Sequence, residues 1–267
     1  MNIVMWIGNE PNQKALANKM HARFGLSGIV LESRKKKRKI SVSKLSGKLM
    51  EKLFAPAPGA AWRNLQEHYR NEFPEFPKVP SAVVEQINSE ITGEFSQSFS
   101  PDLILVSGTS LIRKKLLAGF SSAKILNLHT GLSPYVKGGP NCTNWCLANN
   151  QFHLIGNTIM WIDEGIDSGN ILATEFTPFS GKENLNELHL KVMNHAHDLY
   201  LRAVQSIHEG RNPNLPQKEI ADGKTFYSRE WNWRKTLATQ NNFQKHWRHQ
   251  NENEIRLARN GIKVFPV

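Results

Sequence analysis

The chain has 267 residues, of which 39% are hydrophobic and 21% are charged, a composition that suits a globular protein with a substantial core. The absence of any run of about 18 apolar residues excludes a transmembrane helix, and the opening segment has no basic start or small-residue cleavage site, so we expect a cytoplasmic protein without a membrane partner. The net charge of +11 predicts an anionic partner without selecting its class.

The first predicted elements form a β-α-β unit. An apolar run at residues 2–7 predicts a strand, residues 13–24 have apolar positions at helical spacing, and residues 27–31 predict a second strand. This order is typical of a parallel sheet covered by helices. The turn after the first strand contains Gly8 but not the Gly-x-Gly-x-x-Gly pattern, so we exclude a dinucleotide-binding fold.

A basic run and a predicted helical insertion follow. Residues 34–39 read Arg-Lys-Lys-Lys-Arg-Lys, which indicates either a solvated loop or a phosphate-contacting segment. No aromatic residues are interleaved with it, which argues against a nucleic-acid stacking platform. We expect residues 40–95 to form a helical insertion. Its predicted helices lie at 42–54, 60–73 and 81–94, and proline-rich breaks lie at 55–59 and 74–80.

Strands and helices alternate again in the second half of the chain. The apolar pattern predicts strands at 103–106, 125–129, 158–162 and 171–176, a helix at 141–149 and a long amphipathic helix at 184–209. Three histidines fall on this long helix, and we interpret them as surface or boundary residues: His189, His195 and His197. From residue 218 onward the pattern weakens into a polar tail that contains Trp231, Trp233 and Trp247.

The two cysteines lie four residues apart in the predicted helix at 141–149. Cys142 and Cys146 therefore share a helix face, where packing is a better explanation than a disulfide or a metal pair because no further cysteine joins them. We expect no metal site.

Two polar side chains interrupt the apolar run at 125–129. Asn127 and His129 are two residues apart, so on a strand they point to the same face. The run breaks at Gly131, which places the pair near the carboxyl end of the strand, where open parallel sheets bind ligands. The strand at 158–162 ends in an acidic, glycine-rich loop at 163–169 that could return a carboxylate to the imidazole.

Together these segments resemble the 10-formyltetrahydrofolate-dependent formyltransferase family. The shared pattern is Asn-x-His, a Leu/Ser-Pro loop, a glycine-containing loop and a later Asp-x-Gly/Leu-Asp-x-Gly segment, and it covers most of residues 100–205. The resemblance implies an α/β fold with a Rossmann-like open, mostly parallel sheet flanked by helices, with a helical insertion and a short C-terminal appendage. It also implies a catalytic domain at 1–210 and an extension at 211–267.

The resemblance also assigns residues to roles. The catalytic residues would be Asn127, His129 and Asp167, with Asp163 as the weaker carboxylate candidate. The formyl donor 10-formyltetrahydrofolate would bind at Thr109, Ser110, Leu111, Ile112, Ile162, Asp163, Glu164 and Gly165. The amine substrate would contact Ser133, Pro134, Tyr135 and Lys137.

The reaction requires these residue types independently of the family. Formyl transfer to an amine passes through a tetrahedral carbon with a developing oxyanion, which a carboxamide N–H and an imidazolium N–H can stabilise. A carboxylate beside the imidazole supports its charge and can accept or relay the proton of the amine. No metal and no serine or cysteine nucleophile is required.

The acceptor is less strongly indicated. The Gly-Leu-Ser-Pro-Tyr loop after the histidine is similar to that of formyltransferases of bacterial surface-sugar pathways, which implies an anionic small-molecule amine such as a nucleotide-linked amino sugar. Methionyl-tRNA formyltransferases append a β-barrel longer than the segment after residue 218, so we do not expect nucleic acid. A methionyl-tRNA formyltransferase-like enzyme, a 10-formyltetrahydrofolate hydrolase, a non-catalytic folate-binding module and a homodimer stay open as alternatives.

Overall fold

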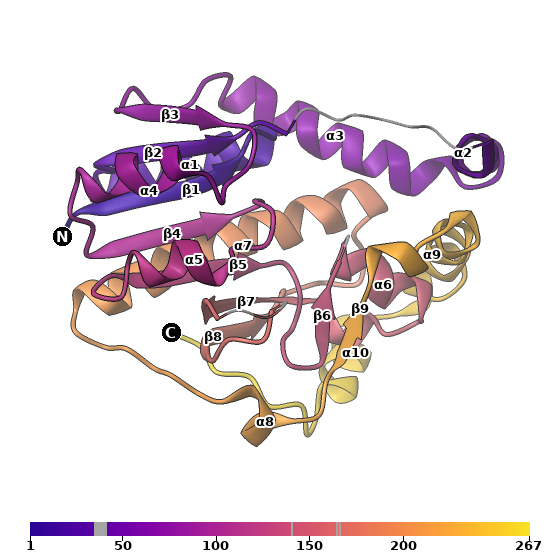
Figure 1. The fold of residues 1–267 in the computed structure, drawn as a ribbon. Helices are drawn as coiled ribbons and strands as arrows, with labels where there is room; N and C mark the ends of the chain where they lie inside the picture. Colours follow the sequence, from indigo (N-terminus) through magenta and orange to yellow (C-terminus); the bar gives the residue numbers. More distant parts are fainter. Residues whose placement is uncertain (35–41, 140, 164, 166) are drawn as a thin grey trace.

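The computed structural model describes residues 1–34, 42–139, 141–163, 165 and 167–267. Its main element is a seven-stranded sheet in the order β3-β2-β1-β4-β5-β7-β8 (Figure 1). The strands are β1 (Ile3–Gly8), β2 (Gly28–Glu32), β3 (Ser81–Val84), β4 (Leu103–Ser107), β5 (Lys124–His129), β7 (Gly156–Trp161) and β8 (Ile171–Phe176). Strands β1 to β5 pair in parallel, whereas β7 and β8 are antiparallel to their neighbours. The predicted mostly parallel, Rossmann-like sheet is therefore confirmed.

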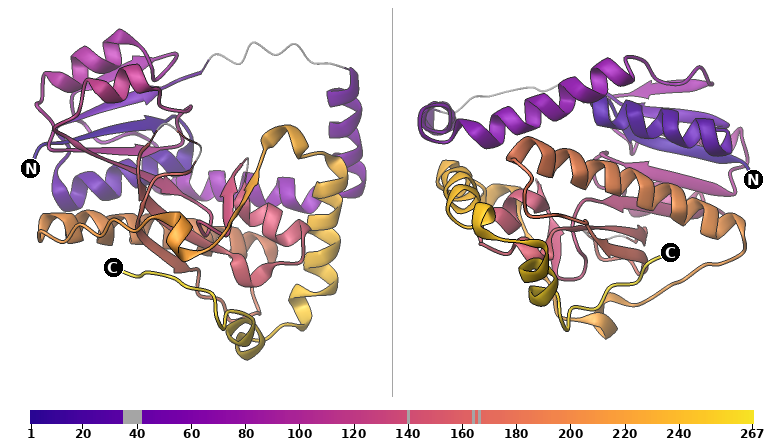
Figure 2. Two further views of the ribbon diagram at one scale, coloured as in Figure 1. Left: turned by 60° about the horizontal axis from the view of Figure 1, so that its bottom comes forward. Right: turned by 180° about the vertical axis from the view of Figure 1, so that it is seen from behind.

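Helices cover both faces of the sheet. In the view from behind, α1 (Pro11–Phe24), α3 (Pro56–Glu72) and α7 (Leu185–His208) lie on one side (Figure 2). The other side carries α4 (Glu90–Gln97) and α5 (Lys114–Ala118). Leu126 and Leu128 of β5 pack in the cluster formed with α1 and α7, whereas Ile125 packs in the cluster on the α4 and α5 side. This alternation leaves Asn127 and His129 on the same side of the strand as Ile125.

The predicted helical insertion is only partly helical. Helix α2 (Val42–Phe54) has the predicted bounds. The predicted break at 55–59 is confirmed only at Ala55, because α2 ends at Phe54 and α3 begins at Pro56. The first turn of a helix tolerates proline, since backbone N–H groups in that turn have no partner within the helix. The predicted helix at 81–94 is also wrong. Its first residues form β3, which pairs with the free edge of β2, and α4 begins only at Glu90. Of the basic run at 34–39, only Arg34 lies within the described residues.

The long helix α7 has the predicted extent. Asn184 and Glu187 form a reciprocal capping box at its start, which satisfies amide groups that would otherwise lack partners. The interpretation of its histidines as surface or boundary residues is wrong for two of them, because His189 and His197 are 5% and 1% exposed. The buried face of α7 is wider than the stripe of apolar residues in the sequence indicated, and it includes the imidazole rings of His189 and His197.

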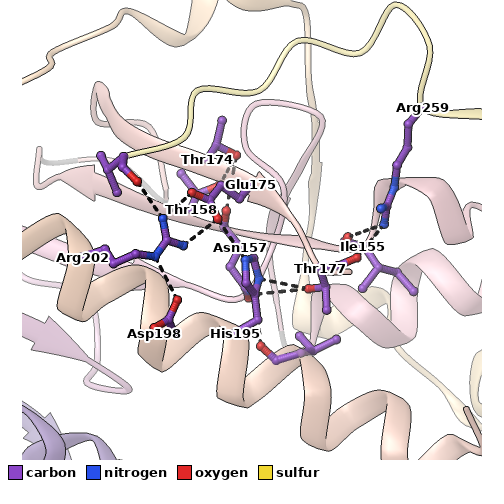
Figure 3. A network of polar contacts seen from close by, with 12 residues as sticks. Ile155, Asn157, Thr158, Thr174, Glu175, Thr177, His195, Asp198, Arg202 and Arg259 are labelled. Atoms are coloured by element: carbon purple, nitrogen blue, oxygen red, sulfur yellow. Dashed lines mark hydrogen bonds and ion pairs between the residues drawn. The ribbon is translucent and has the colours of Figure 1, made fainter. Parts of the chain in front are cut away.

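The third histidine of α7 links three elements of the fold. His195 Nε2 lies 3.1 Å from Glu175 Oε2, and the Asn157 amide donates to His195 Nδ1 at 2.9 Å (Figure 3). Arg202 donates two hydrogen bonds of 2.7 Å to the same Glu175 carboxylate. Burial alone would raise the pKa of Glu175, but hydrogen bonds from His195 and Arg202 lower it to about 2. The network therefore fastens α7 to β7 and β8.

The segment predicted as a polar tail packs closely against the rest of the chain. It contains α8 (Gln217–Ile220), β9 (Lys224–Phe226), α9 (Trp233–Lys245) and α10 (Glu252–Ala258). Strand β9 pairs in parallel with β6 (Val136–Gly138) in a second, two-stranded sheet (Figure 1). Arg259 donates to the carbonyls of Ile155 and Thr177, which anchors the segment after α10 (Figure 3).

A second apolar cluster joins this extension to α6 (Cys142–Ala148). Trp247 is fully buried in it, contacts the rings of Phe152, Phe179 and Phe243, and donates from its indole nitrogen to the Glu183 carbonyl at 2.8 Å. Both cysteines of α6 are buried, unbridged members of this cluster, as their spacing predicted. The prediction of a polar tail from residue 218 onward was wrong because the few apolar residues of this segment are widely spaced and form no periodic pattern.

No helix within the described ranges is long and apolar enough to cross a membrane.

Replacing Trp247 with alanine tests whether the extension is part of the cooperative fold. We expect Trp247→Ala to lower the free energy of unfolding by about 3–5 kcal/mol, the usual cost of deleting a large buried aromatic side chain. Trp62→Ala in α3 is the control, because that indole is 38% exposed and should cost about 1 kcal/mol or less. Urea denaturation of both variants measures the difference. Equal, small losses would show that the extension contributes little to folding.

Candidate active site

A cavity of about 380 Å³ lies beside Asn127, at the carboxyl ends of β4 and β5. Its walls are mainly the loop after β4 and the loop after β7, and one residue of the C-terminal extension also lines it. The lining residues are Val106, Gly108, Thr109, Ser110, Leu111, Ile112, Asn127, Met160, Trp161, Ile162, Asp163, Gly165, Asp167, Ser168, Gly169 and Ser228. The two loops predicted to hold the formyl donor thus face each other across one cavity.

Next to the cavity, His129 and Asp167 form a buried ion pair. His129 Nδ1 lies 3.2 Å from Asp167 Oδ2, with side-chain exposures of 8% and 15%. The same carboxylate oxygen accepts the backbone N–H of Gly138 at 3.0 Å. The opposite ring nitrogen, Nε2, lies 3.2 Å from the Val136 carbonyl. Asn127 and Asp167 line the cavity, whereas His129 is held behind them by contacts on both ring nitrogens.

Strand direction explains why Asp167, rather than Asp163, reaches the imidazole. Strand β7 is antiparallel to β5, so Trp161 at its end lies opposite Leu126, three residues before His129. The following loop must return along β5 before a carboxylate can meet the ring. Asp163 comes too early in this loop, and its Oδ1 instead accepts the Gly165 N–H at 3.0 Å and the Ser168 hydroxyl at 2.7 Å.

The surroundings of His129 stabilise its charged form. Burial by itself lowers the pKa of the imidazole, but the Asp167 carboxylate, followed by Cys142 and then the Val136 carbonyl, outweighs burial and raises the pKa to about 10. Both N–H groups of an imidazolium then meet acceptors, which a neutral ring could not achieve. The site therefore holds a cation and an anion in contact at neutral pH.

The loop after β5 is shaped to admit this ring. Cys142 Sγ lies 3.6 Å from His129 Nε2, and a Cβ atom added to Gly131 would collide with the same nitrogen. Glycine at this position therefore lets the chain turn tightly around the imidazole. The Gly131 in the sequence indicated only the end of the strand, and nothing in the pattern indicated that Cys142 would contact the ring.

A buried carboxylate fixes the loop after β4. Glu32, at the end of β2, accepts the backbone N–H of Ser110 at 2.6 Å and the Ser110 hydroxyl, and it also accepts the Ile87 N–H at 3.0 Å. Arg34 lies 3.4 Å from Glu32 and donates to the Gly108 carbonyl. Leu111 is 51% exposed at the cavity, whereas Ile112 is buried. Glu32 was missed because an acidic residue at a strand end gives no indication of the distant loop that it binds.

The four predicted substrate-binding residues do not line the cavity. Ser133 and Pro134 are buried residues of the loop after β5, and the Ser133 N–H donates to the Thr158 hydroxyl at 2.9 Å. The Tyr135 hydroxyl accepts the Lys263 N–H, and Lys137 lies in β6 opposite Thr225. Their assignment to the acceptor stays a prediction. Of the eight predicted donor residues, Glu164 lies outside the described residues, and the other seven line the cavity.

Two residues of the C-terminal extension contribute to the site, and no sequence pattern indicated either of them. Ser228 reaches the cavity directly, and Gln217 donates hydrogen bonds to the carbonyls of Asp167 and Gly169. In the described part of the chain, no group of three or more His, Cys, Asp or Glu side chains could hold a metal ion.

Comparison with known proteins agrees with this geometry. The model of the formyl transferase family matches residues 2–204, so the chain belongs to that family. A methionyl-tRNA formyltransferase of Syntrophus aciditrophicus is 36% identical over 126 residues, which are 47% of this chain and 40% of that protein. The chain spans between 30% and 53% of the length of the curated relatives to which it is compared.

Solved structures share the fold. An N-formyltransferase from Helicobacter canadensis, in complex with folinic acid and dTDP-3-aminofucose, superposes with a TM-score of 0.56 at 12% identity and covers 90% of this chain and 80% of its own. Glycinamide ribonucleotide transformylase 1 from Symbiobacterium toebii gives 0.52 at 16% identity, with 80% of this chain and 94% of its own covered. At these identities the similarity establishes the fold alone.

The raised pKa of His129 predicts a specific dependence of stability on pH. Between the unfolded value of 6.5 and the folded value of about 10, the folded state binds the extra proton, so stability must fall as pH rises through this window. The slope contributed by one such group is at most about 1.4 kcal/mol per pH unit. Denaturation at several pH values should show this loss in the wild type and its absence in His129→Gln. Parallel pH profiles for the two proteins would contradict a charged His129.

Proposed function

We propose that this protein transfers a formyl group from 10-formyltetrahydrofolate to a primary amine of a small molecule, most directly a nucleotide-linked amino sugar. The observation that carries the proposal is the arrangement of Asn127 and Asp167 at one cavity, with the imidazolium of His129 bound to the carboxylate behind them. This arrangement provides a hydrogen-bond donor and a fixed carboxylate at the place where a formyl carbon would react. Membership of the formyl transferase family supports the reaction class.

The cavity suits a folate donor. Its volume of about 380 Å³ lies within the usual range of small-molecule sites. Its lining combines the apolar residues Leu111, Met160 and Ile162 with polar residues, as a flat heteroaromatic ring with an edge of donors and acceptors requires. The Helicobacter canadensis relative was solved with folinic acid, a formylated folate. We propose that the loops at 109–112 and 162–165 hold the pteridine.

Asn127 is the residue that we assign to the oxyanion. It lies half-buried in the middle of the cavity wall, flanked by Val106 and Met160 on the neighbouring strands. Its fixed carboxamide can donate to the formyl oxygen as the carbon becomes tetrahedral. Removal of one such donor typically costs about a hundred- to a thousandfold in turnover.

Asp167 is the group that we assign to the proton. Its Oδ2 atom takes the contacts with His129 and Gly138, and we propose that Oδ1 receives the proton of the attacking amine. The amine nitrogen bonds to the formyl carbon, the bond from that carbon to the folate nitrogen breaks, and the proton passes to the departing nitrogen. The contact with His129 keeps the Asp167 side chain oriented while Oδ1 takes up the proton and passes it on.

Two observations point to different acceptors. The curated relatives are named methionyl-tRNA formyltransferases, which favours an aminoacyl-tRNA as a second candidate. The Helicobacter canadensis relative binds dTDP-3-aminofucose. We therefore prefer the small acceptor, with residues 1–210 as the catalytic unit and 211–267 as its extension.

A screen of acceptors tests the proposed function. Purified protein and 10-formyltetrahydrofolate are incubated with a panel of nucleotide-linked amino sugars, with methionyl-tRNA, or without an acceptor, and the products are read by mass spectrometry. We expect a formyl adduct on an amino sugar. An adduct on methionyl-tRNA alone would select the second candidate, and free formate from every reaction would indicate a hydrolase. No turnover of the donor under any condition would contradict the proposal.

Asn127→Ala should separate chemistry from binding. We expect turnover to fall by about a hundred- to a thousandfold, because the oxyanion loses its fixed donor. The thermal unfolding midpoint should change little, because this half-buried side chain faces the cavity and contributes little packing. Steady-state kinetics and thermal unfolding of the same preparation provide the two readouts. Wild-type turnover in the folded variant would remove Asn127 from the mechanism.

The two aspartates of the loop after β7 should behave differently. Asp167→Asn keeps the size of the side chain but removes the charge that supports His129, so kcat should fall severely with the donor KM nearly unchanged. Asp163→Asn removes a contact that shapes the donor loop, so its effect should appear mainly as a higher donor KM. The reverse pattern would show that the carboxylate assignment is wrong.

A further inference from the structure

We infer that Gln217 is a positioning residue for Asp167, and that the segment 215–228 of the C-terminal extension completes the active site. The inference rests on the proposed function for its activity readouts, but not for its structural readout. It assigns a catalytic purpose to a segment that lies outside the 2–204 match to the family.

One buried amide holds the backbone of the catalytic loop. Gln217, the first residue of α8, is 6% exposed. Its Nε2 atom lies 2.8 Å from the Asp167 carbonyl and 2.7 Å from the Gly169 carbonyl. A carboxamide has two N–H groups on this atom, so each carbonyl receives one of them.

The Asp167 backbone has a conformation that needs such support. Its φ angle is +49°, in the left-handed region that L-residues with a side chain rarely adopt. Such a conformation persists only where the surrounding structure enforces it. This backbone conformation helps to turn the carboxylate toward His129. The two hydrogen bonds from Gln217 hold the backbone carbonyls of Asp167 and Gly169, the residues on either side of Ser168.

The same segment also supports the carboxylate end of Asp167. The Gly138 N–H that binds Oδ2 belongs to β6, and β6 pairs with β9, with Gly138 opposite Phe226. A Cβ atom at Gly138 would collide with the Phe226 carbonyl, so the two strands are in close contact. Asp167 is thus held through its backbone by Gln217 and through its side chain by the β6–β9 pair.

Two further contacts bind this segment to the cavity. Leu215 and Ile171 exchange backbone hydrogen bonds of 2.8 and 2.9 Å, which fix the start of the segment to β8 just after the catalytic loop. Ser228, at its end, lines the cavity itself. The segment therefore runs from the base of the Asp167 loop to the wall of the site, beside β6 (Figure 1).

A matched glutamine elsewhere distinguishes positioning from general support of the fold. Gln240 in α9 also makes two backbone hydrogen bonds, donating to the Phe54 carbonyl at 3.2 Å and accepting the Ala57 N–H at 3.1 Å. It belongs to the same extension but joins α9 to α2 and α3, away from the cavity. Loss of its hydrogen bonds would weaken the fold without touching the Asp167 loop.

The test compares Gln217→Met with Gln240→Met in the full-length protein. Methionine fills a similar volume and has no N–H group. We expect Gln217→Met to lower kcat by roughly ten- to a hundredfold, the scale of small misplacements in active sites, with a smaller change in the donor KM. Gln240→Met should retain wild-type kinetics. In an Asp167→Asn background, Gln217→Met should add little, because both changes act on one interaction.

The structural readout is the ionisation of His129, followed by NMR with labelled histidine. When Asp167 is free to move away, burial of the ring prevails, so the midpoint should shift to lower pH in Gln217→Met and stay unchanged in Gln240→Met. If Gln217→Met does not fold, Gln217→Asn, which keeps the amide on a shorter stem, should show a smaller shift in the same direction. An unchanged His129 midpoint in a folded Gln217 variant would overturn the inference. Failure of the acceptor screen with a shifted midpoint would contradict only the proposed function.

Discussion

The ion pair of His129 and Asp167 joins two strands that run in opposite directions, and the geometry of the site follows from that constraint. Because β7 is antiparallel to β5, the loop after β7 begins opposite Leu126, on the far side of Asn127 from His129, and has to fold back to reach the imidazole. The returning loop forms one wall of the cavity, and the loop after β4 forms the other. The same return places Asp167 in a left-handed conformation, which neighbouring elements must hold. The cavity wall and the charged pair therefore both depend on the return of this one loop.

Burying a charged pair is favourable only when the remaining polar atoms are satisfied. Here the carboxylate also accepts the Gly138 N–H, and the imidazole nitrogen opposite the pair faces the Val136 carbonyl. Both partners belong to β6, which is held in register by β9 of the extension. The extension therefore supports the elements that surround the ion pair as well as the rest of the fold.

Much of this arrangement is predictable from sequence, and the failures have local causes. The β-α-β opening, α7 and the strand carrying Asn127 and His129 have clear periodicity, and the acidic loop at 163–169 indicated a carboxylate at the imidazole. Strand β3 was mistaken for a helix because four residues at a sheet edge carry little pattern and depend on β2 for their pairing. Glu32, Gln217 and Trp247 contact segments far away in sequence, which local spacing cannot reveal. The acceptor is least predictable, because the residues that we assigned to it do not line the cavity.

The charge of His129 at mildly alkaline pH is the most direct test of this account. An ordinary histidine is neutral at pH 8, whereas a ring bound to Asp167 with a pKa of about 10 is still protonated. The nitrogen chemical shifts of His129 in the folded protein at pH 8 distinguish the two forms. The account predicts an imidazolium with both nitrogens protonated, and a neutral ring at that pH would contradict it.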